Sequence, residues 1–164
     1  MMKYYLSLGS NINAEANLIL AIEKLQKILK KTEFSSVHQT KAEGFEGDDF
    51  LNLVMSGESE LTFDNLNIKL KEIEDESGRI RDVPKFSART LDVDIVLQLE
   101  DDEILFESDE IEKYSFVSDP LKEISSNPIA VGFGISSPEH IIKVRQWGAD
   151  GVIIGSAFVK RISD

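Results

Sequence analysis

The chain of 164 residues is long enough to bury one hydrophobic core together with a small appendage. Its formal net charge of −12 disfavours general attraction to nucleic acid and to anionic membranes, so we expect neither as a partner. The absence of cysteine excludes disulfides and zinc sites built from thiolates.

The N-terminal residues predict a strand over residues 4–8, and the Gly-Ser-Asn triplet at 9–11 predicts the turn that ends it. No apolar run here is long enough for a signal peptide, and none in the chain is long enough to cross a membrane. We therefore expect a cytoplasmic protein.

Apolar residues at helical spacing predict a first helix over residues 14–31. A second strand is predicted over residues 33–40 and a third over residues 50–58. Alternation along the third strand places Leu51, Leu53 and Met55 on one face and Phe50, Asn52 and Val54 on the other. Thr62 then has the position of an N-cap for a second helix, which Gly78 ends.

Residues 91–97 have the composition of a fourth strand, and they place two aspartates on one face. The apolar residues expected on the opposite face are Leu91, Val93, Ile95 and Leu97. Asp92 and Asp94 would stand side by side, and because adjacent carboxylates repel, the pair indicates a cation between them. Oxygen ligands favour a hard ion such as Mg²⁺, which usually also binds substrate phosphates. Taken alone, the same pattern also fits a solvated face of a sheet.

A basic cluster precedes this strand in an otherwise acidic chain: Arg79, Arg81, Lys85 and Arg89. Arginine forks fit phosphate oxygens, and metal-binding carboxylates beside guanidinium groups are what phosphoryl-type transfer requires.

The predicted order of strand, helix, strand, strand, helix and strand is that of a ferredoxin-like βαββαβ sandwich, in the α+β class. Helices would cover one face of an antiparallel sheet and leave the other free for a substrate groove. Residues 100–112, which carry eight acidic side chains and no basic one, predict a solvated loop or turn.

Three stretches resemble one family. The run GRIR…FSARTLDVDIV at residues 78–96 resembles the signature of 6-hydroxymethyl-7,8-dihydropterin pyrophosphokinases, and DFLNLV at 49–54 and YSFVSDPLKEI at 114–124 are similar to further parts of it. The resemblance implies an ATP-dependent, Mg²⁺-requiring transferase of folate biosynthesis. It would move pyrophosphate from ATP to the hydroxymethyl group of the pterin and leave AMP.

The same resemblance implies roles for individual residues. The metal would be held by Asp92 and Asp94, and charge on the transferred group would be neutralised by Arg79, Arg81 and Arg89. The nucleotide would be bound by Glu74, Arg81, Phe86, Arg89 and Ile95. The pterin would be bound by Thr40, Phe50, Asn52 and Phe116, with the two phenylalanines stacking on its ring.

Two positions depart from the pattern of many family members. Those members have a His-Pro pair shortly after the fourth strand, where this chain has Ser108 and Asp109. They have an Arg just before the Phe, where this chain has Tyr114. Both missing side chains would contact the triphosphate. A pterin- or nucleotide-binding homologue without catalysis therefore stays open as an alternative.

The last part of the chain has a different pattern, with predicted strands over residues 129–133 and 152–154 and a helix between them. It closely resembles the end of the tryptophan synthase alpha chain, a (β/α)₈ barrel. The resemblance implies a remnant of a phosphate site at Gly134, Gly155 and Ser156. Without the resemblance, a tight turn that needs glycine is the favoured explanation of Gly155 and Ser156. Two strands cannot close a barrel, and the catalytic carboxylates of that enzyme come from earlier strands.

We interpret the chain as a fusion or chimera. A pyrophosphokinase-like domain would span residues 1–125, and an appended βαβ unit like a piece of that barrel would span residues 126–164. A tryptophan synthase alpha-chain fragment is the rival interpretation, supported by the tail alone. The many large apolar residues of the tail need burial, so we expect it to dock or to cause self-association.

Overall fold

The computed structural model describes residues 1–42, 45–83, 87–125, 130–131 and 151–152. The chain divides into two compact units, Met1–Ile124 and Ser125–Asp164.

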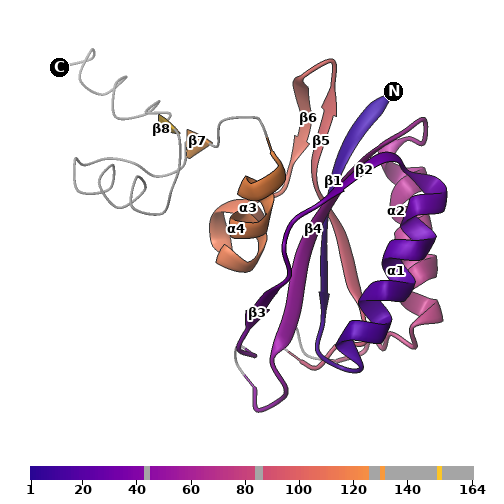
Figure 1. Ribbon diagram of the computed structural model, residues 1–164, viewed down its shortest axis with the longest axis vertical. Coiled ribbons are helices and arrows are strands. Elements are labelled where there is room, and N and C mark those ends of the chain that lie inside the picture. Colours follow the sequence, from indigo (N-terminus) through magenta and orange to yellow (C-terminus); the bar gives the residue numbers. More distant parts are fainter. Residues whose placement is uncertain (43–44, 84–86, 126–129, 132–150, 153–164) are drawn as a thin grey trace. The chain divides into compact units, whose positions relative to one another are not determined.

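The first unit is a mixed α/β structure around one antiparallel sheet (Figure 1). Its elements are β1 (Met2–Ser10), α1 (Ala14–Ile28), β2 (Lys30–Phe34), β3 (His38–Thr40), β4 (Phe50–Ser59), α2 (Phe63–Glu76), β5 (Asp92–Glu100), β6 (Glu103–Glu107), α3 (Glu110–Lys113) and α4 (Ser115–Ile124). The strand order is β2-β4-β1-β5-β6, and β3 also pairs with β4. The order β2-β4-β1-β5 is the one that the predicted sandwich requires, and β6 extends it at one edge.

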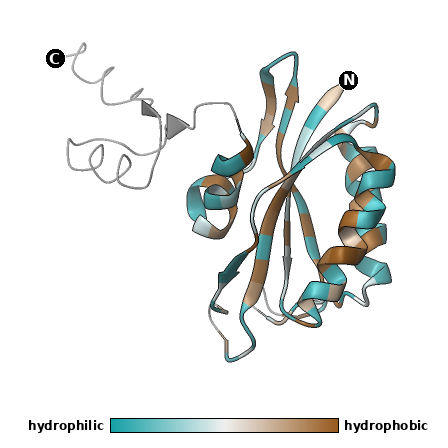
Figure 2. Ribbon diagram, viewed as in Figure 1, coloured by the Kyte–Doolittle hydropathy of each residue, from teal (hydrophilic) through white to brown (hydrophobic). Residues whose placement is uncertain are grey.

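Helices α1 and α2 cover one face of the sheet, and the main core lies between these two layers (Figure 1). Its strand residues include Tyr4, Leu6 and Leu8 of β1, which are fully buried. Figure 2 shows the hydrophobic residues of α1, α2, β4 and β5 in brown. The alternation predicted for β4 is confirmed, because Leu53 and Met55 join this core whereas Val54 joins the cluster on the opposite face.

The predicted ends of α2 are confirmed, whereas the predicted end of α1 is not. Thr62 caps α2 by accepting a hydrogen bond from the backbone N–H of Asn65 at 3.3 Å, and Gly78 follows the helix with φ +81°, as predicted. The predicted end of α1 was wrong, because the helix stops at Ile28. Leu29 is already extended at φ −106° and ψ 141°, and the next residues belong to β2.

The opposite face of the sheet is not wholly free, which corrects the prediction. Apolar side chains of α3 and α4 pack on one half of it, and the members of this second cluster include Tyr5, Val54, Leu97, Ile111, Val117 and Leu121. The burial of these side chains stabilises the docked helices. Among the described residues, the cavity reported below opens on a part of this face that these helices do not cover.

Leu97 belongs to this second cluster, so the prediction that it shares a face with Leu91, Val93 and Ile95 was wrong. The cause is an irregularity between β1 and β5, where Tyr5 is opposite Leu97 but Leu6 is opposite Ile95. One extra residue in a strand reverses the faces of all residues after it.

The acidic stretch is a β-hairpin and a short helix, not the predicted loop. Strand β6 pairs with β5 through a turn at Asp101 and Asp102, whose φ angles are 48° and 67°. Aspartate tolerates this left-handed conformation, which suits a two-residue hairpin turn. The acidic side chains remain compatible with a strand because β6 is an edge strand, where charge prevents further pairing.

The predicted second strand is divided into β2 and β3. Between them, the Ser35 hydroxyl accepts the backbone N–H of Val54 at 2.9 Å, so a side chain replaces a backbone partner at the break.

In the second unit, β7 (Ala130–Val131) and β8 (Gly151–Val152) pair in parallel, and they overlap the two strands predicted for the tail. The helix predicted between them lies outside the described residues. In the part of the chain that the structure describes, no helix has the length and apolar character needed to span a membrane.

Candidate active site

A cavity opens on the half of the sheet that α3 and α4 leave uncovered. Its walls come from β1, β3, β4 and β5, from the loop between β3 and β4, from the segment before β5, and from α3, α4 and the residue between them. They consist of Ser7, Gly9, Thr40, Lys41, Phe45, Phe50, Asn52, Ser87, Arg89, Asp92, Asp94, Glu110, Tyr114 and Phe116. The four residues proposed from the resemblance for the pterin thus lie in one cavity with Arg89 and both aspartates.

One part of the cavity is aromatic. The rings of Tyr114 and Phe116 are stacked, with centroids 4.9 Å apart and planes 15° apart. Phe45 meets Phe50 edge to face at 6.4 Å. Such rings offer flat apolar surface to a planar ligand.

A polar pair lies beside these rings. Asn52 is 4% exposed, and its amide nitrogen donates a hydrogen bond to the Thr40 hydroxyl at 2.8 Å. Gly9 gives the amide its space, since a Cβ at this position would lie only 2.9 Å from the Asn52 Oδ1. The predicted turn at Gly9 was wrong, because β1 runs to Ser10 and Gly9 pairs within the sheet with Asn52 and Asp92. This glycine of the Gly-Ser-Asn triplet is therefore needed for close approach and not for a turn.

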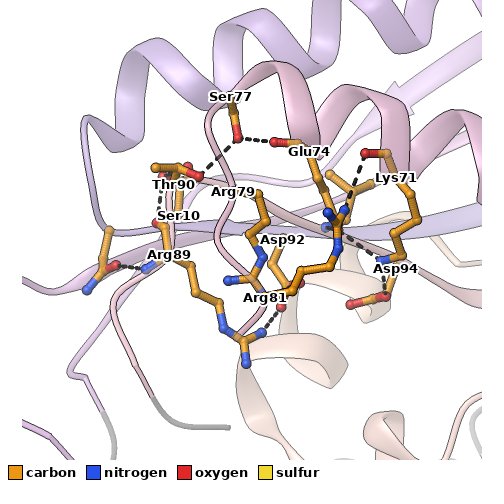
Figure 3. Close-up of polar contacts among 12 residues, drawn as sticks. Ser10, Lys71, Glu74, Ser77, Arg79, Arg81, Arg89, Thr90, Asp92 and Asp94 are labelled. Atoms are coloured by element: carbon orange, nitrogen blue, oxygen red, sulfur yellow. Dashed lines mark hydrogen bonds and ion pairs between the residues drawn. The ribbon is translucent and has the colours of Figure 1, made fainter. Parts of the chain in front are cut away.

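The other two residues of that triplet hold the segment that carries Arg89. Asn11 accepts the backbone N–H of Arg89 at 2.7 Å, and its amide nitrogen donates to the carbonyl of Asp48 at 3.0 Å. The Ser10 hydroxyl donates to the carbonyl of Thr90. The end of β1 is thereby fastened to the start of β5 (Figure 3).

The two aspartates lie on the cavity face of β5, as predicted, and each has cationic partners (Figure 3). Asp92 accepts a hydrogen bond from Arg89 and pairs with the Arg79 Nη2 at 3.5 Å. Asp94 pairs with the Lys71 Nζ at 3.3 Å. The mutual repulsion expected from the sequence is therefore offset by three cations.

Arg79 carries the clearest sign of a missing partner. Its side chain is 10% exposed, and its Nε and Nη1 are buried without any hydrogen-bond partner. Buried donors of this kind are costly, and a guanidinium group satisfies them best with carboxylate or phosphate oxygens. Arg79 does not itself line the cavity, but its Nη2 lies against Asp92, which does.

Glu74, which was proposed for the nucleotide, does not line the cavity. Its side chain is 1% exposed and accepts the backbone N–H of Val93 at 2.8 Å, Lys71 at 3.0 Å and Arg81 at 2.9 Å. Arg81 also pairs with Asp75 and is 44% exposed. Glu74 thus ties α2 and Arg81 to β5, which is a positioning role.

Lys71 was missed in the sequence, although its spacing of three residues from Glu74 on one helix was a signal for it. Burial lowers the pKa of the Lys71 ammonium, but the carboxylates of Asp94 and Glu74 outweigh this effect and raise the pKa above its usual value. Lys71 therefore remains charged.

The remaining proposed residues lie elsewhere. Ile95 is 6% exposed and belongs to the main core, so the structure does not bring it to the cavity. Phe86, Gly134, Gly155 and Ser156 lie outside the described residues.

Comparison with known proteins decides the family. The family model described as 7,8-dihydro-6-hydroxymethylpterin-pyrophosphokinase matches residues 5–126. The chain belongs to this pyrophosphokinase family. One relative, the 2-amino-4-hydroxy-6-hydroxymethyldihydropteridine pyrophosphokinase of Aquifex aeolicus, is 37% identical over 137 residues, which cover 79% of this chain and 84% of the relative. The cavity described above lies wholly within the part that matches the pyrophosphokinase model.

The tail matches a second family. A tryptophan synthase alpha chain model matches residues 108–164, so it overlaps the end of the pyrophosphokinase match. The alpha chain of a Prochlorococcus marinus strain is 84% identical over 44 residues, and that of Arabidopsis thaliana is 55% identical over 53 residues. The chain spans 16% and 19% of the length of these two relatives. Both resemblances noted in the sequence are thereby confirmed.

Proposed function

We propose that the chain transfers pyrophosphate from ATP to the hydroxymethyl group of 6-hydroxymethyl-7,8-dihydropterin and releases AMP. One observation carries the proposal: a single cavity joins an aromatic and amide wall to a pair of carboxylates with an arginine beside them. Membership of the pyrophosphokinase family supports the same reaction.

The aromatic part of the cavity would hold the pterin. Phe50 and Phe116 would contact the faces of its ring, while Asn52 and Thr40 would bind its polar edge. The hydrogen bond between Asn52 and Thr40 fixes the amide before the ligand arrives, so little side-chain entropy is lost on binding.

The carboxylate part fits Mg²⁺ with ATP phosphates. In the described ranges, no group of three or more His, Cys, Asp or Glu side chains is placed to hold a metal ion. Asp92 and Asp94 alone would therefore leave several positions to phosphate oxygens and water, which is how Mg²⁺ is commonly bound at nucleotide sites. Arg89, which lines the cavity, would bind the phosphate oxygens of the same complex, and Arg79 would add positive charge behind Asp92.

The mechanism rests on positioning and electrostatics. Bound Mg²⁺ would supply neutralisation of phosphate charge. Arg79 and Arg89 would stabilise the negative charge that develops on the transferred group, and Glu74 would keep Arg81 and β5 in place. Binding of both substrates in this cavity would hold the hydroxymethyl oxygen near the phosphate, and such positioning supplies much of the rate enhancement.

A protein that binds the same ligands without catalysis is the second candidate. One observation favours it: Tyr114, at the position where many family members have Arg, lines the cavity with its ring stacked on Phe116. A tyrosine adds stacking surface but no positive charge for a triphosphate. The tryptophan synthase alternative has the support of the tail match alone.

Two measurements together test the proposal. Incubation with Mg-ATP and the pterin should yield AMP, whereas the binding protein would retain an ATP analogue and the pterin without producing AMP. Asp92→Asn and Asp94→Asn should each abolish Mg²⁺-dependent transfer while far-UV circular dichroism stays unchanged. Asp119→Asn is the matched control, because Asp119 is 55% exposed and pairs only weakly with Lys122 at 3.7 Å. Unchanged transfer in both cavity variants would remove the metal assignment.

A further inference from the structure

Lys71 is placed between a buried carboxylate and a proposed metal ligand. Its Nζ lies 3.0 Å from the Glu74 Oε1 and 3.3 Å from the Asp94 Oδ1 (Figure 3). Both oxygens therefore share one ammonium group. Asp94 is half-exposed, at 43%, and lines the cavity, whereas Glu74 is buried.

We propose that Lys71 is a resident counter-ion of Asp94, which a divalent ion must displace before it can bind there. The proposal deepens the proposed function and rests on its assignment of Asp94 to the metal. An ammonium group and a divalent ion cannot share the same carboxylate oxygen at short distance, because their charges repel. Lys71 thus sets how strongly the site binds the ion.

The structure provides the means for this exchange. Lys71 is 38% exposed and has a flexible four-carbon stem, so its ammonium can leave Asp94 for water. Glu74 remains as its second partner, and the ammonium group is therefore never left without a counter-charge. The displacement needs no movement of the backbone.

The two aspartates differ in the cations with which they pair. Asp92 is paired with Arg89, which lines the cavity and would turn to phosphate oxygens, and with the largely buried Arg79, which does not line it. Asp94 is paired with Lys71 of α2, whose ammonium Glu74 also holds and which does not line the cavity. The competition is therefore between Lys71 and the ion at Asp94.

The test measures binding of Mn²⁺ alone to the full chain, without nucleotide or pterin, from the electron paramagnetic resonance signal of the free ion. Lys71→Gln should bind Mn²⁺ more tightly than the parent by about three- to tenfold, because the ion no longer breaks a half-exposed ion pair. Lys69→Gln is the matched control: it removes the same charge from the same helix, at a side chain that pairs with Glu72 on the surface. Its affinity should stay within about twofold of the parent, because exposed charges are strongly screened.

Two further variants separate displacement from a structural effect. Lys71→Arg keeps the charge and should bind Mn²⁺ like the parent. In an Asp94→Asn background, Lys71→Gln should no longer strengthen binding, because the contested carboxylate is absent. Glu74 keeps Arg81 and the Val93 N–H as partners in all these variants, so the fold is retained and circular dichroism checks it.

An equal or weaker affinity in Lys71→Gln would overturn the proposal, as would an equal gain in Lys69→Gln or a gain that persists with Asp94→Asn. Absence of Mn²⁺ binding in parent and variants would overturn it together with the metal assignment. If the expected pattern appeared in a chain that formed no AMP, the proposed reaction would fail while the competition at Asp94 stood.

Discussion

Replacement of Glu74 by glutamine should destabilise the first unit, although the side chain lies outside the cavity. The carboxylate is 1% exposed and accepts three hydrogen bonds, two of them from cations. Glutamine keeps the size of the side chain and can still accept the Val93 N–H. It loses the charge, and its amide nitrogen then faces Lys71 or Arg81 as a second donor.

The structure sets the size of the effect. Breaking a wholly buried ion pair costs about 3–5 kcal/mol. Lys71 is 38% exposed and Arg81 is 44% exposed, so water can solvate both cations once the carboxylate is gone. We therefore expect a loss of about 2 kcal/mol in the free energy of unfolding for Glu74→Gln. Glu74→Ala should cost more, because the Val93 N–H would lose its partner as well.

Urea denaturation followed by far-UV circular dichroism measures this loss. With an ordinary dependence on urea, the midpoint should fall by about 1 M in Glu74→Gln. Glu72→Gln on the same helix is the control, since Glu72 is 54% exposed and should shift the free energy by less than about 0.5 kcal/mol. Equal midpoints for the two variants would refute the view that Glu74 holds α2 and Arg81 to β5.

Three further predictions concern the cavity, the link between β3 and α4, and the tail. Arg89→Ala should weaken binding of an ATP analogue by about 2 kcal/mol in calorimetric titration, because a charge-assisted contact is lost; unchanged affinity would make the cluster a surface feature. Glu123 accepts hydrogen bonds from the Ser36 backbone N–H at 2.6 Å and then from His38 and the Ser36 hydroxyl, and these lower its pKa from 4.5 to about 2. Glu123 therefore contributes stability above about pH 4.5, and this contribution is lost as the pH falls towards 2. As the pH is lowered over this window, the urea midpoint should fall less steeply in Glu123→Gln than in the parent. Truncation after Ser125 should leave pterin and nucleotide binding largely in place and change light scattering; complete loss of binding in a folded truncation would show that the tail helps to build the site.

Periodicity and turn chemistry predicted most of the first unit. The N-cap at Thr62 and the stop at Gly78 could be recognised because each depends on a local side chain or backbone conformation. The faces of β4 followed from alternation. The face of Leu97 could not be predicted, since it depends on an irregularity in pairing with β1. The hairpin of β6 was missed because an acidic edge strand and an acidic loop have similar composition.

The candidate site, too, could be predicted only in part from the sequence. Asp92 and Asp94 were found because the strand period alone places them together. The residues proposed for the pterin came from the family resemblance, and the structure adds their common cavity. The contact of Lys71 with Asp94 and the burial of Glu74 were not foreseen, because both depend on how α2 packs on β5. The unsatisfied donors of Arg79 likewise appear only once the side chain is buried.

The measurement that tests the central claim most directly is the fate of the ATP phosphates. The chain is incubated with Mg-ATP labelled at the β phosphate and with 6-hydroxymethyl-7,8-dihydropterin, and the products are separated by chromatography. We predict AMP and a pterin that carries the label, in equal amounts, with neither formed by Asp94→Asn. Bound pterin and ATP that remain unchanged, or ADP in place of AMP, would contradict the assignment as a pyrophosphokinase.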